Sequence, residues 1–421
     1  MKRLLCMVLT IVMALSLTAA FAEDDPLRVA WWGSQTSSSI YLAVDELFIK
    51  ETGIQTLPEY CPFADYETKL NTMAAGNILP DEFRTDYCFI KNFVDKGLLM
   101  DLTPLVESGL IDLSNVDPAA IQGGMINGGL YGINAGSNAY CAIFNKKLVE
   151  EAGMEIPSNE CTWEEFEQWA IEFTEKTGKY AVDLYGVRDY ELFRIFARSV
   201  NEALYSEDQL SVGYTAETLA AFYASIQRML NAGATQKIAD ITVDVGDESR
   251  PFAKGEAAVY FTYNESATTY AMQLKEIYGE DVLVYNIVPG SAANKGMFVQ
   301  PSQYLSISAN TQRVEDAAAY INYWVNSPEA NLSVNGRRGV PINPEMSKLV
   351  GENLDDIARH SFEYIDLVAK YSSDLYAPDP AAHDEISDAW KDAFVGVMYG
   401  DMTAEEAAQS VIDLANNALN N

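Results

Sequence analysis

The sequence predicts an α/β protein built as two lobes, each a mostly parallel β-sheet flanked by helices. From residue 27 onward, short apolar segments alternate with amphipathic helical segments, and the pattern restarts after about residue 135. Such alternation favours a parallel sheet with helices on both faces. The length of 421 residues allows two or three globular units at roughly 150 residues each.

The first part of the chain predicts three strands and two helices. Residues 27–32 form a short apolar strand, and a helix with apolar residues at i, i+4, i+7 and i+8 follows and ends at Gly53. A second strand starts at Gly53. Asp65 is expected to cap a helix that ends at Gly76, and residues 81–86 form a third, weaker strand.

The second part of the chain carries clear helix-start signals. Thr162 with Glu165, and Thr403 with Glu406, have the spacing of a capping box. The helix that begins after Thr162 is expected to end at Gly178. Two more apolar stripes at helical spacing lie within 219–230 and 314–325.

Charge and composition exclude several classes of function. The chain has 28 basic and 61 acidic residues, a net charge of −33, with 48% hydrophobic and 21% charged residues. This composition is typical of a folded domain. The negative charge repels phosphates and anionic lipids, so we expect no nucleic-acid partner and no membrane-surface binding.

Residues 1–22 have the pattern of a secretory signal peptide. Lys2 and Arg3 precede an apolar run over 4–17, and Ala20-Phe21-Ala22 provides a small-residue cleavage site. Cleavage would leave 26 basic and 61 acidic residues, a net charge of −35. We therefore expect an exported protein in the periplasm or at the cell surface. No cysteine lies at the cleavage point to carry a lipid.

Cysteine and histidine positions predict neither a metal site nor a cofactor. The cysteine spacings match no metal-binding motif, and the two histidines are remote from them. The four cysteines that follow the cleavage site could form disulfides or could be buried free thiols, and the sequence favours neither. The residues concerned are Cys61, Cys88, Cys141, Cys161, His360 and His383.

Seven short strings, taken in order and with their spacing, resemble one protein family. They lie at 29–35 (VAWWGSQ), 65–81, 96–102 (KGLLMDL), 129–146, 161–166 (CTWEEF) and 252–258 (FAKGEAA), the fourth range holding two of them. Together they are similar to the extracellular solute-binding proteins of bacterial ABC importers, specifically the sugar-binding family that includes maltose-binding proteins.

The resemblance implies a periplasmic-binding-protein fold whose two lobes are joined by a three-segment hinge, with ligand in the cleft between them. One lobe would hold residues 23–136 and 296–328, and the other 137–295 and 329–421. The crossings are expected near 135–140, 287–297 and 325–340. It further implies a monomer without enzymatic activity that delivers a sugar to ABC transporter permease subunits.

A sugar site needs aromatic rings for the ring faces and short polar side chains for the hydroxyls. In the first lobe, strand alternation favours Trp32 over Trp31 for the cleft, although both could be core. Gln35 follows in the next loop. The family resemblance implies a polar contact at the end of the third strand, at Asp86 and Tyr87; a helix cap is the alternative for Asp86. Thr85 and Cys88 stand where maltose-type relatives have bulkier residues, so the ligand preference of those relatives is not carried over to this chain.

The other candidate residues come from the crossings and the second lobe. Asn138 lies in the first crossing, where a hinge role is the alternative. Tyr263 stands closest to the family's ligand-stacking aromatic, and one of Arg337 and Arg338 could reach the cleft. The full set adds Tyr185, Asn264 and Gln303.

Three other functions stay open from the sequence. The same fold could bind a polyamine or ferric iron, which the acidity would favour. A secreted carbohydrate-active enzyme would need a pair of carboxylates at catalytic spacing, and no motif marks one. A sensor domain would share every feature described so far.

Overall fold

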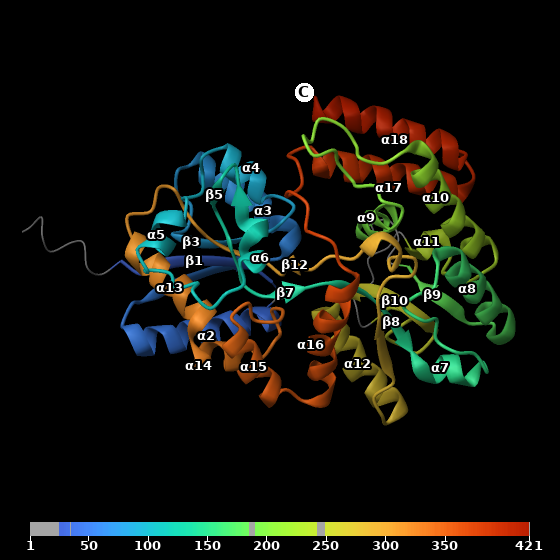
Figure 1. The fold of residues 1–421 in the computed structure, drawn as a ribbon, viewed down its shortest axis with the longest axis horizontal. Helices are drawn as coiled ribbons and strands as arrows, with labels where there is room; N and C mark the ends of the chain where they lie inside the picture. The colour runs from blue at the N-terminus through green and yellow to red at the C-terminus, as the bar shows by residue number, and fades with distance from the viewer. Residues whose placement is uncertain (1–24, 34, 185–189, 242–248, 421) are drawn as a thin grey trace, which may run out of the picture.

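The computed structural model describes residues 25–33, 35–184, 190–241 and 249–420. Two α/β lobes lie side by side, with the short strands β7 (Ser137–Asn138) and β12 (Gln300–Pro301) between them (Figure 1). The predicted two-lobe α/β class is confirmed. Among the described residues, no helix is long and apolar enough to cross a membrane.

The first lobe is built on a five-stranded sheet of order β2-β1-β3-β13-β6. Strand β1 pairs in parallel with β2 and β3, whereas β13 runs antiparallel to β3 and β6. The strand bounds are β1 (Leu27–Trp32), β2 (Thr56–Cys61), β3 (Glu82–Thr85), β6 (Ile133–Asn134) and β13 (Tyr304–Ile307).

Helices cover both faces of this sheet. They are α2 (Gln35–Thr52), α3 (Phe63–Ala75), α4 (Ile90–Asp95), α5 (Thr103–Glu107), α6 (Pro118–Ile121), α13 (Val314–Asn326) and α14 (Pro328–Val334). A two-stranded ribbon, β4 (Met125–Ile126) with β5 (Gly129–Leu130), follows the short helix η1 (Gln122–Gly124).

The second lobe has a four-stranded sheet of order β11-β8-β10-β9. Strand β8 is antiparallel to β10 and β11, and β10 is parallel to β9. Both sheets are therefore mixed. Strands β8 and β13 enter their lobes directly from a crossing, and each runs against its neighbours. The bounds are β8 (Tyr140–Asn145), β9 (Tyr180–Asp183), β10 (Ala257–Tyr263) and β11 (Leu283–Asn286).

The remaining helices complete the second lobe and its join to the first. They are α7 (Lys146–Glu151), α8 (Trp163–Thr177), α9 (Tyr190–Ser199), α10 (Ala216–Asn231), α11 (Ile238–Ile241), α12 (Asn264–Tyr278), η4 (Ala293–Lys295), α15 (Pro344–Asn353), α16 (Asp356–Val368), η5 (Ala369–Tyr371), α17 (His383–Tyr399) and α18 (Ala404–Leu419). Helix α14 packs on α2, and α16 packs on α12, so the chain changes lobe for the last time around α15.

Local sequence signals set several of these boundaries. Both capping boxes are present, at Thr162 with Glu165 and at Thr403 with Glu406. Gly178 ends α8 with φ +68°, as predicted. The prediction for Asp65 is wrong. Helix α3 begins at Phe63, three residues earlier than a cap at Asp65 would place it, and Asp65 lies in its first turn, where a carboxylate suits the helix dipole.

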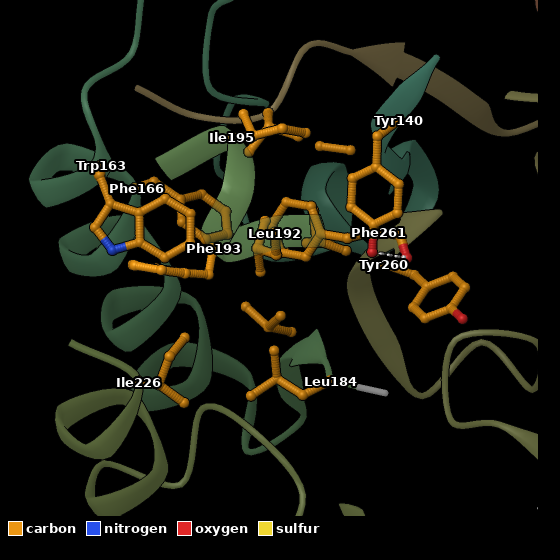
Figure 2. Packing of buried hydrophobic residues seen from close by; sticks show 14 of the residues in the cluster. Tyr140, Trp163, Phe166, Leu184, Leu192, Phe193, Ile195, Ile226, Tyr260 and Phe261 are labelled. Atoms are coloured by element: carbon orange, nitrogen blue, oxygen red, sulfur yellow. Dashed lines mark hydrogen bonds between the residues drawn. The ribbon is translucent and has the colours of Figure 1, made fainter. Parts of the chain in front are cut away.

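Aromatic side chains fill the core of the second lobe (Figure 2). Trp163 lies beside Phe166, with ring centroids 5.6 Å apart, and its indole Nε1 donates to Ser225 Oγ at 2.8 Å. Tyr140 and Phe261 belong to the neighbouring strands β8 and β10 and extend this packing to the sheet. The core thus fixes β8 and β10, whose ends carry residues of the cleft.

Three chain segments meet at the junction of the lobes. The amide of Ser302 donates to Gly136 O at 2.7 Å, and the amide of Ser137 donates to Val340 O at 2.7 Å. Ser302 Oγ also donates to Arg338 O at 2.6 Å. A Cβ on Gly136 would lie 2.2 Å from that same Arg338 oxygen, so only glycine fits. These contacts form the three-segment hinge.

The return crossing runs through β12, later in the chain than the expected 287–297 stretch. Ile287, Val288 and Met297 are buried in the core of the second lobe, so this stretch does not span the gap. The four cysteines of the described residues are free thiols.

Candidate functional site

The facing surfaces of the lobes are linked by an extended segment, residues 373–380, which we name the strap. It connects η5 to α17 and runs between the lobes (Figure 1). Tyr87, two residues after β3, has its hydroxyl 2.9 Å from Tyr376 O and 2.8 Å from Ala377 O. It donates its single proton to one of them at a time, so a first-lobe side chain binds main-chain atoms of the strap.

An ion-pair network anchors the strap to the second lobe. Arg194 of α9 donates to Asp379 through Nη1 at 3.0 Å and Nη2 at 2.7 Å, and to Glu191 Oε1 at 3.1 Å. Burial by itself would raise the pKa of Asp379, but Arg194 and His383 outweigh it and the pKa lies below its usual value. The guanidinium carbon of Arg194 lies 5.7 Å from the ring centre of Tyr87, so this network reaches the first lobe.

Aromatic rings gather at the carboxyl ends of β1 and β2. Trp32, the last residue of β1, packs edge-on against Phe63 at 5.3 Å and Tyr66 at 5.4 Å. Trp31 turns to the opposite face, is 1% exposed and stacks on Tyr41 at 4.7 Å. Phe63 is 50% exposed. Trp32 and Phe63 thus offer an accessible aromatic patch at the strand ends, where open α/β sheets bind ligands.

The hinge side of the cleft carries polar groups. Gln300 of β12 donates to Tyr263 Oη at 3.0 Å, and Tyr263 packs edge-on against Tyr140 at 5.2 Å. Asn138 pairs with Gln300 across β7 and β12, and its side chain hydrogen-bonds to Glu265. Burial raises the pKa of Tyr263, and the charges of Glu191 and Asp86 raise it further. Charged groups of both lobes therefore influence the Tyr263 hydroxyl.

A cavity of about 410 Å³ opens on the second-lobe side of the strap. Arg194, Tyr205, Gln209, Tyr376 and Asp379 are among its lining residues. The strap therefore separates this cavity from Tyr87 and the first lobe. Among the described residues, no group of three or more His, Cys, Asp or Glu side chains is placed to hold a metal ion.

Comparison with known families gives the decisive observation. The family model described as "Bacterial extracellular solute-binding protein" matches residues 43–358, well over half of the chain. The chain belongs to this family.

Solved structures of solute-binding proteins share its fold. A periplasmic solute-binding protein from Pectobacterium atrosepticum superposes with a TM-score of 0.82 at 22% identity, covering 94% of this chain and 98% of that one. A periplasmic oligogalacturonide-binding protein from Yersinia enterocolitica, solved with saturated digalacturonic acid, gives 0.79 at 23% identity over 94% and 98%. An ABC substrate-binding protein from Listeria monocytogenes, solved with cycloalternan, gives 0.77 at 19% identity over 93% and 99%. At these identities the likeness concerns the fold.

For five of the predicted residues of this solute-binding protein the structure gives a position, and their role in ligand binding stays a prediction. Trp32, Asp86 and Tyr87 come from the first lobe, and Asn138 and Tyr263 from the hinge side. Asp86 Oδ1 accepts the amide of Cys88 at 3.0 Å. Burial raises the pKa of Asp86, and the hydrogen bonds from Cys88 offset part of that effect.

Three predicted residues are used elsewhere in the structure. Asn264 is fully buried; its Oδ1 accepts from the Ala139 amide at 2.8 Å and its Nδ2 donates to Ser361 Oγ at 2.8 Å. Gln303 Nε2 donates to Tyr41 Oη at 2.7 Å inside the first lobe. Arg337 is exposed and bonds carbonyls at the end of α14.

The neighbouring Arg338 points into the molecule, with its guanidinium carbon 4.9 Å from the ring centre of Tyr41. Tyr185 lies outside the described residues. Gln35 opens α2, and its side chain is not among those described.

Four residues named above were not among the predicted site residues. Phe63 and Glu265 each lie two residues after the end of a strand, and Trp32 and Tyr263 are the last residues of their strands, so position near a strand end was a usable signal. Glu191 and Arg194 lie in an amphipathic helix, where polar residues read as solvent-facing. No sequence signal marked them, because Asp379, the carboxylate that Arg194 binds, is 185 residues away in the sequence.

Proposed function

We propose that the protein captures a sugar or oligosaccharide in the cleft between its lobes and delivers it to an ABC transporter permease. The observation that carries this proposal is that the chain offers both kinds of surface, an aromatic patch of Trp32 with Phe63 and polar groups around Asn138, Tyr263 and Glu265. Sugars need both kinds of surface, a flat apolar face for ring C–H groups and hydrogen-bonding groups for hydroxyls.

The printed names of fold neighbours support the ligand class. Proteins of this fold were solved with digalacturonic acid, with cycloalternan and, in Streptomyces glaucescens, with acarbose. All three are carbohydrates or carbohydrate analogues. The likeness in sequence is too low to transfer any one of them to this chain.

Binding would work through hinge closure. A ligand that contacts both lobes binds the closed form more tightly, and this difference shifts the population toward closure. Moving the open-to-closed equilibrium from 1:99 to 99:1 takes about 5.5 kcal/mol. A micromolar ligand has about 8 kcal/mol of binding free energy, which is sufficient. The hydrogen bond from Tyr87 to the strap would further stabilise the closed form.

The proposed partners follow from this role. The protein would act outside the cytoplasmic membrane as a monomer, and the permease subunits would recognise the two lobe surfaces in their closed arrangement. The ligand would leave unchanged, since this role includes no catalytic step.

Thermal melts of the protein lacking residues 1–22 against a panel of mono- and oligosaccharides test the proposal, with spermidine and ferric citrate included. A ligand at 100 times its Kd should add about 2.7 kcal/mol to the free energy of unfolding, which raises the melting temperature by a few degrees. Chromatography of the recovered sugar should show no product. A shift only with spermidine or iron, or conversion of the sugar, would contradict the proposed function.

A further inference from the structure

The cavity of about 410 Å³ beside the strap has not been assigned a role so far. Its described lining residues belong to the strap, to α9 and to the loop 201–213 that follows α9, and none of them belongs to the first lobe. Small-molecule sites usually have volumes of about 300–1,000 Å³. The cavity therefore has the size of a binding site and is built without the first lobe.

The walls of this cavity are held together by hydrogen bonds within the protein. In the loop 201–213, the amide of Gly213 donates to Leu204 O at 3.0 Å. Gln209 Nε2 donates to Pro378 O at 2.7 Å and ties the loop to the strap. A site that is already ordered loses little conformational entropy when a ligand binds.

Tyr376 supplies an aromatic surface to the cavity. This strap residue lines the cavity and is 46% exposed. The guanidinium carbon of Arg198 lies 4.2 Å from its ring centre, so Arg198 covers one face of the ring. Arg198 is itself fixed, because its Nη2 donates to Ser373 Oγ at 2.7 Å and its Nε donates to Gly296 O at 3.1 Å. The opposite face of the Tyr376 ring is the one on which a ligand ring can stack.

The charged groups of the wall are partnered within the protein. Arg194 and Asp379 bind each other through two hydrogen bonds, and His383 Nδ1 lies 3.5 Å from Asp379 Oδ2. Glu202 accepts the amide and the hydroxyl of Thr215, both at 3.1 Å. These pairs leave no buried charge of the wall in need of a counter-ion, so the cavity suits a neutral polar ligand.

We propose that this cavity is a second saccharide site, in which one sugar ring stacks on Tyr376 and its hydroxyls bond to the side chains of Glu207 and Gln209. Both of these residues line the cavity, and Glu207 is exposed. Sugar hydroxyls that donate to a carboxylate form charge-assisted hydrogen bonds, which are roughly twice as strong as neutral ones. This inference rests on the proposed function, from which it takes the ligand class, and adds a binding place outside the cleft.

Calorimetry on the protein lacking residues 1–22 tests the inference. The probes are the saccharides that stabilise the protein in the thermal screen, together with methyl glucoside and methyl galactoside as single sugar units. We expect two binding sites for each chain. Tyr376→Ala should weaken one of them about tenfold, because the stacking surface is lost, and should leave the other unchanged.

Further variants show which site is which. Trp32→Ala should weaken the cleft site and leave the cavity site intact, whereas Tyr376→Phe keeps the ring and should keep both. Tyr399→Ala removes a tyrosine that is 55% exposed and does not line the cavity, and it should change neither site. If Tyr376→Ala fails to fold, Glu207→Gln at the exposed rim replaces it and should weaken the cavity site alone.

The outcomes separate the two proposals. A single site that Trp32→Ala weakens and Tyr376→Ala leaves unchanged would overturn this inference while the sugar-binding function stands. A single site that both variants weaken would also overturn it, because the cavity would then be no separate site. If no saccharide binds, the sugar-binding function fails and this inference fails with it.

Discussion

The hydroxyl of Tyr87 in the first lobe lies 2.8 Å from the carbonyl oxygen of Ala377 in the strap, although 290 residues separate them. The strap is in turn held to the second lobe by Arg194 through Asp379. This chain of contacts joins the two lobes at a second place besides the hinge. Any movement that separates the lobes here must break the hydrogen bond of Tyr87.

Removing this bond should weaken ligand binding without unfolding the protein. Tyr87→Phe keeps the ring beside Arg194 and loses only the hydroxyl. A hydrogen bond of this kind contributes about 0.5–1.5 kcal/mol, so we expect the Kd to rise about two- to tenfold. Calorimetry with the best saccharide measures the change. Tyr399→Phe, at a tyrosine 55% exposed, is the matched control; an unaltered Kd for Tyr87→Phe would refute the role of the bond.

Two adjacent tryptophans should have separable roles. Trp32→Ala removes a ring from the aromatic patch and should weaken sugar binding more than tenfold while the fold survives. Trp31→Ala empties a fully packed core position and should instead lower the free energy of unfolding by about 3–5 kcal/mol. Circular dichroism melts and calorimetry on both variants distinguish the effects. Normal affinity in a folded Trp32→Ala protein would remove Trp32 from the site.

The hinge should not tolerate a side chain at Gly136. In Gly136→Ala the new Cβ would meet Arg338 O at 2.2 Å, so the three segments must separate. We expect a lower melting temperature and weaker ligand binding together. Gly351→Ala is the control, because this helical glycine has only Phe362 nearby, at 3.9 Å. That variant should be neutral or stabilised by up to about 1 kcal/mol.

Stability should depend on pH through a buried carboxylate. Burial raises the pKa of Asp45 from 3.8 to about 6, despite the hydrogen bond from Tyr320. The folded state therefore holds the proton of Asp45 more tightly than the unfolded state does. The resulting contribution to the free energy of unfolding is complete below pH 4 and is lost as the pH rises through 6. Between these limits the loss is about 3 kcal/mol.

Urea unfolding between pH 4 and 8 measures this effect. Asp45→Asn cannot ionise and keeps an acceptor for Tyr320, so its stability should fall less with pH than that of the unmodified protein. Asp366→Asn, at an exposed position of α16, should follow the unmodified protein. Parallel curves for all three proteins would contradict the assignment.

Features set by local sequence were predictable. The capping boxes at Thr162 and Thr403 depend on residues three positions apart, and strand alternation alone separated Trp31 from Trp32. The prediction for Asp65 was wrong because helix α3 begins directly after Pro62, so Asp65 lies inside the first turn and not at the N-cap.

Side-chain roles in the cleft depended on distant partners. Asn264 and Gln303 look available in the sequence, yet their amides are occupied by Ser361 and Tyr41. The local sequence around Arg194 did not predict its role, because the strap residue that it binds, Asp379, comes much later in the chain. Residue type and strand position nominate candidates, but the packing of remote segments decides which of them are free.

The main-chain path through the hinge also constrains the order in which the molecule can fold. Thr85 of β3 and Ser306 of β13 bond through their hydroxyls at 2.8 Å, across 221 residues of intervening chain. The first sheet therefore stays incomplete until the whole second sheet and the return segment have left the ribosome. A chain assembled in this order spends most of its synthesis without a finished first lobe.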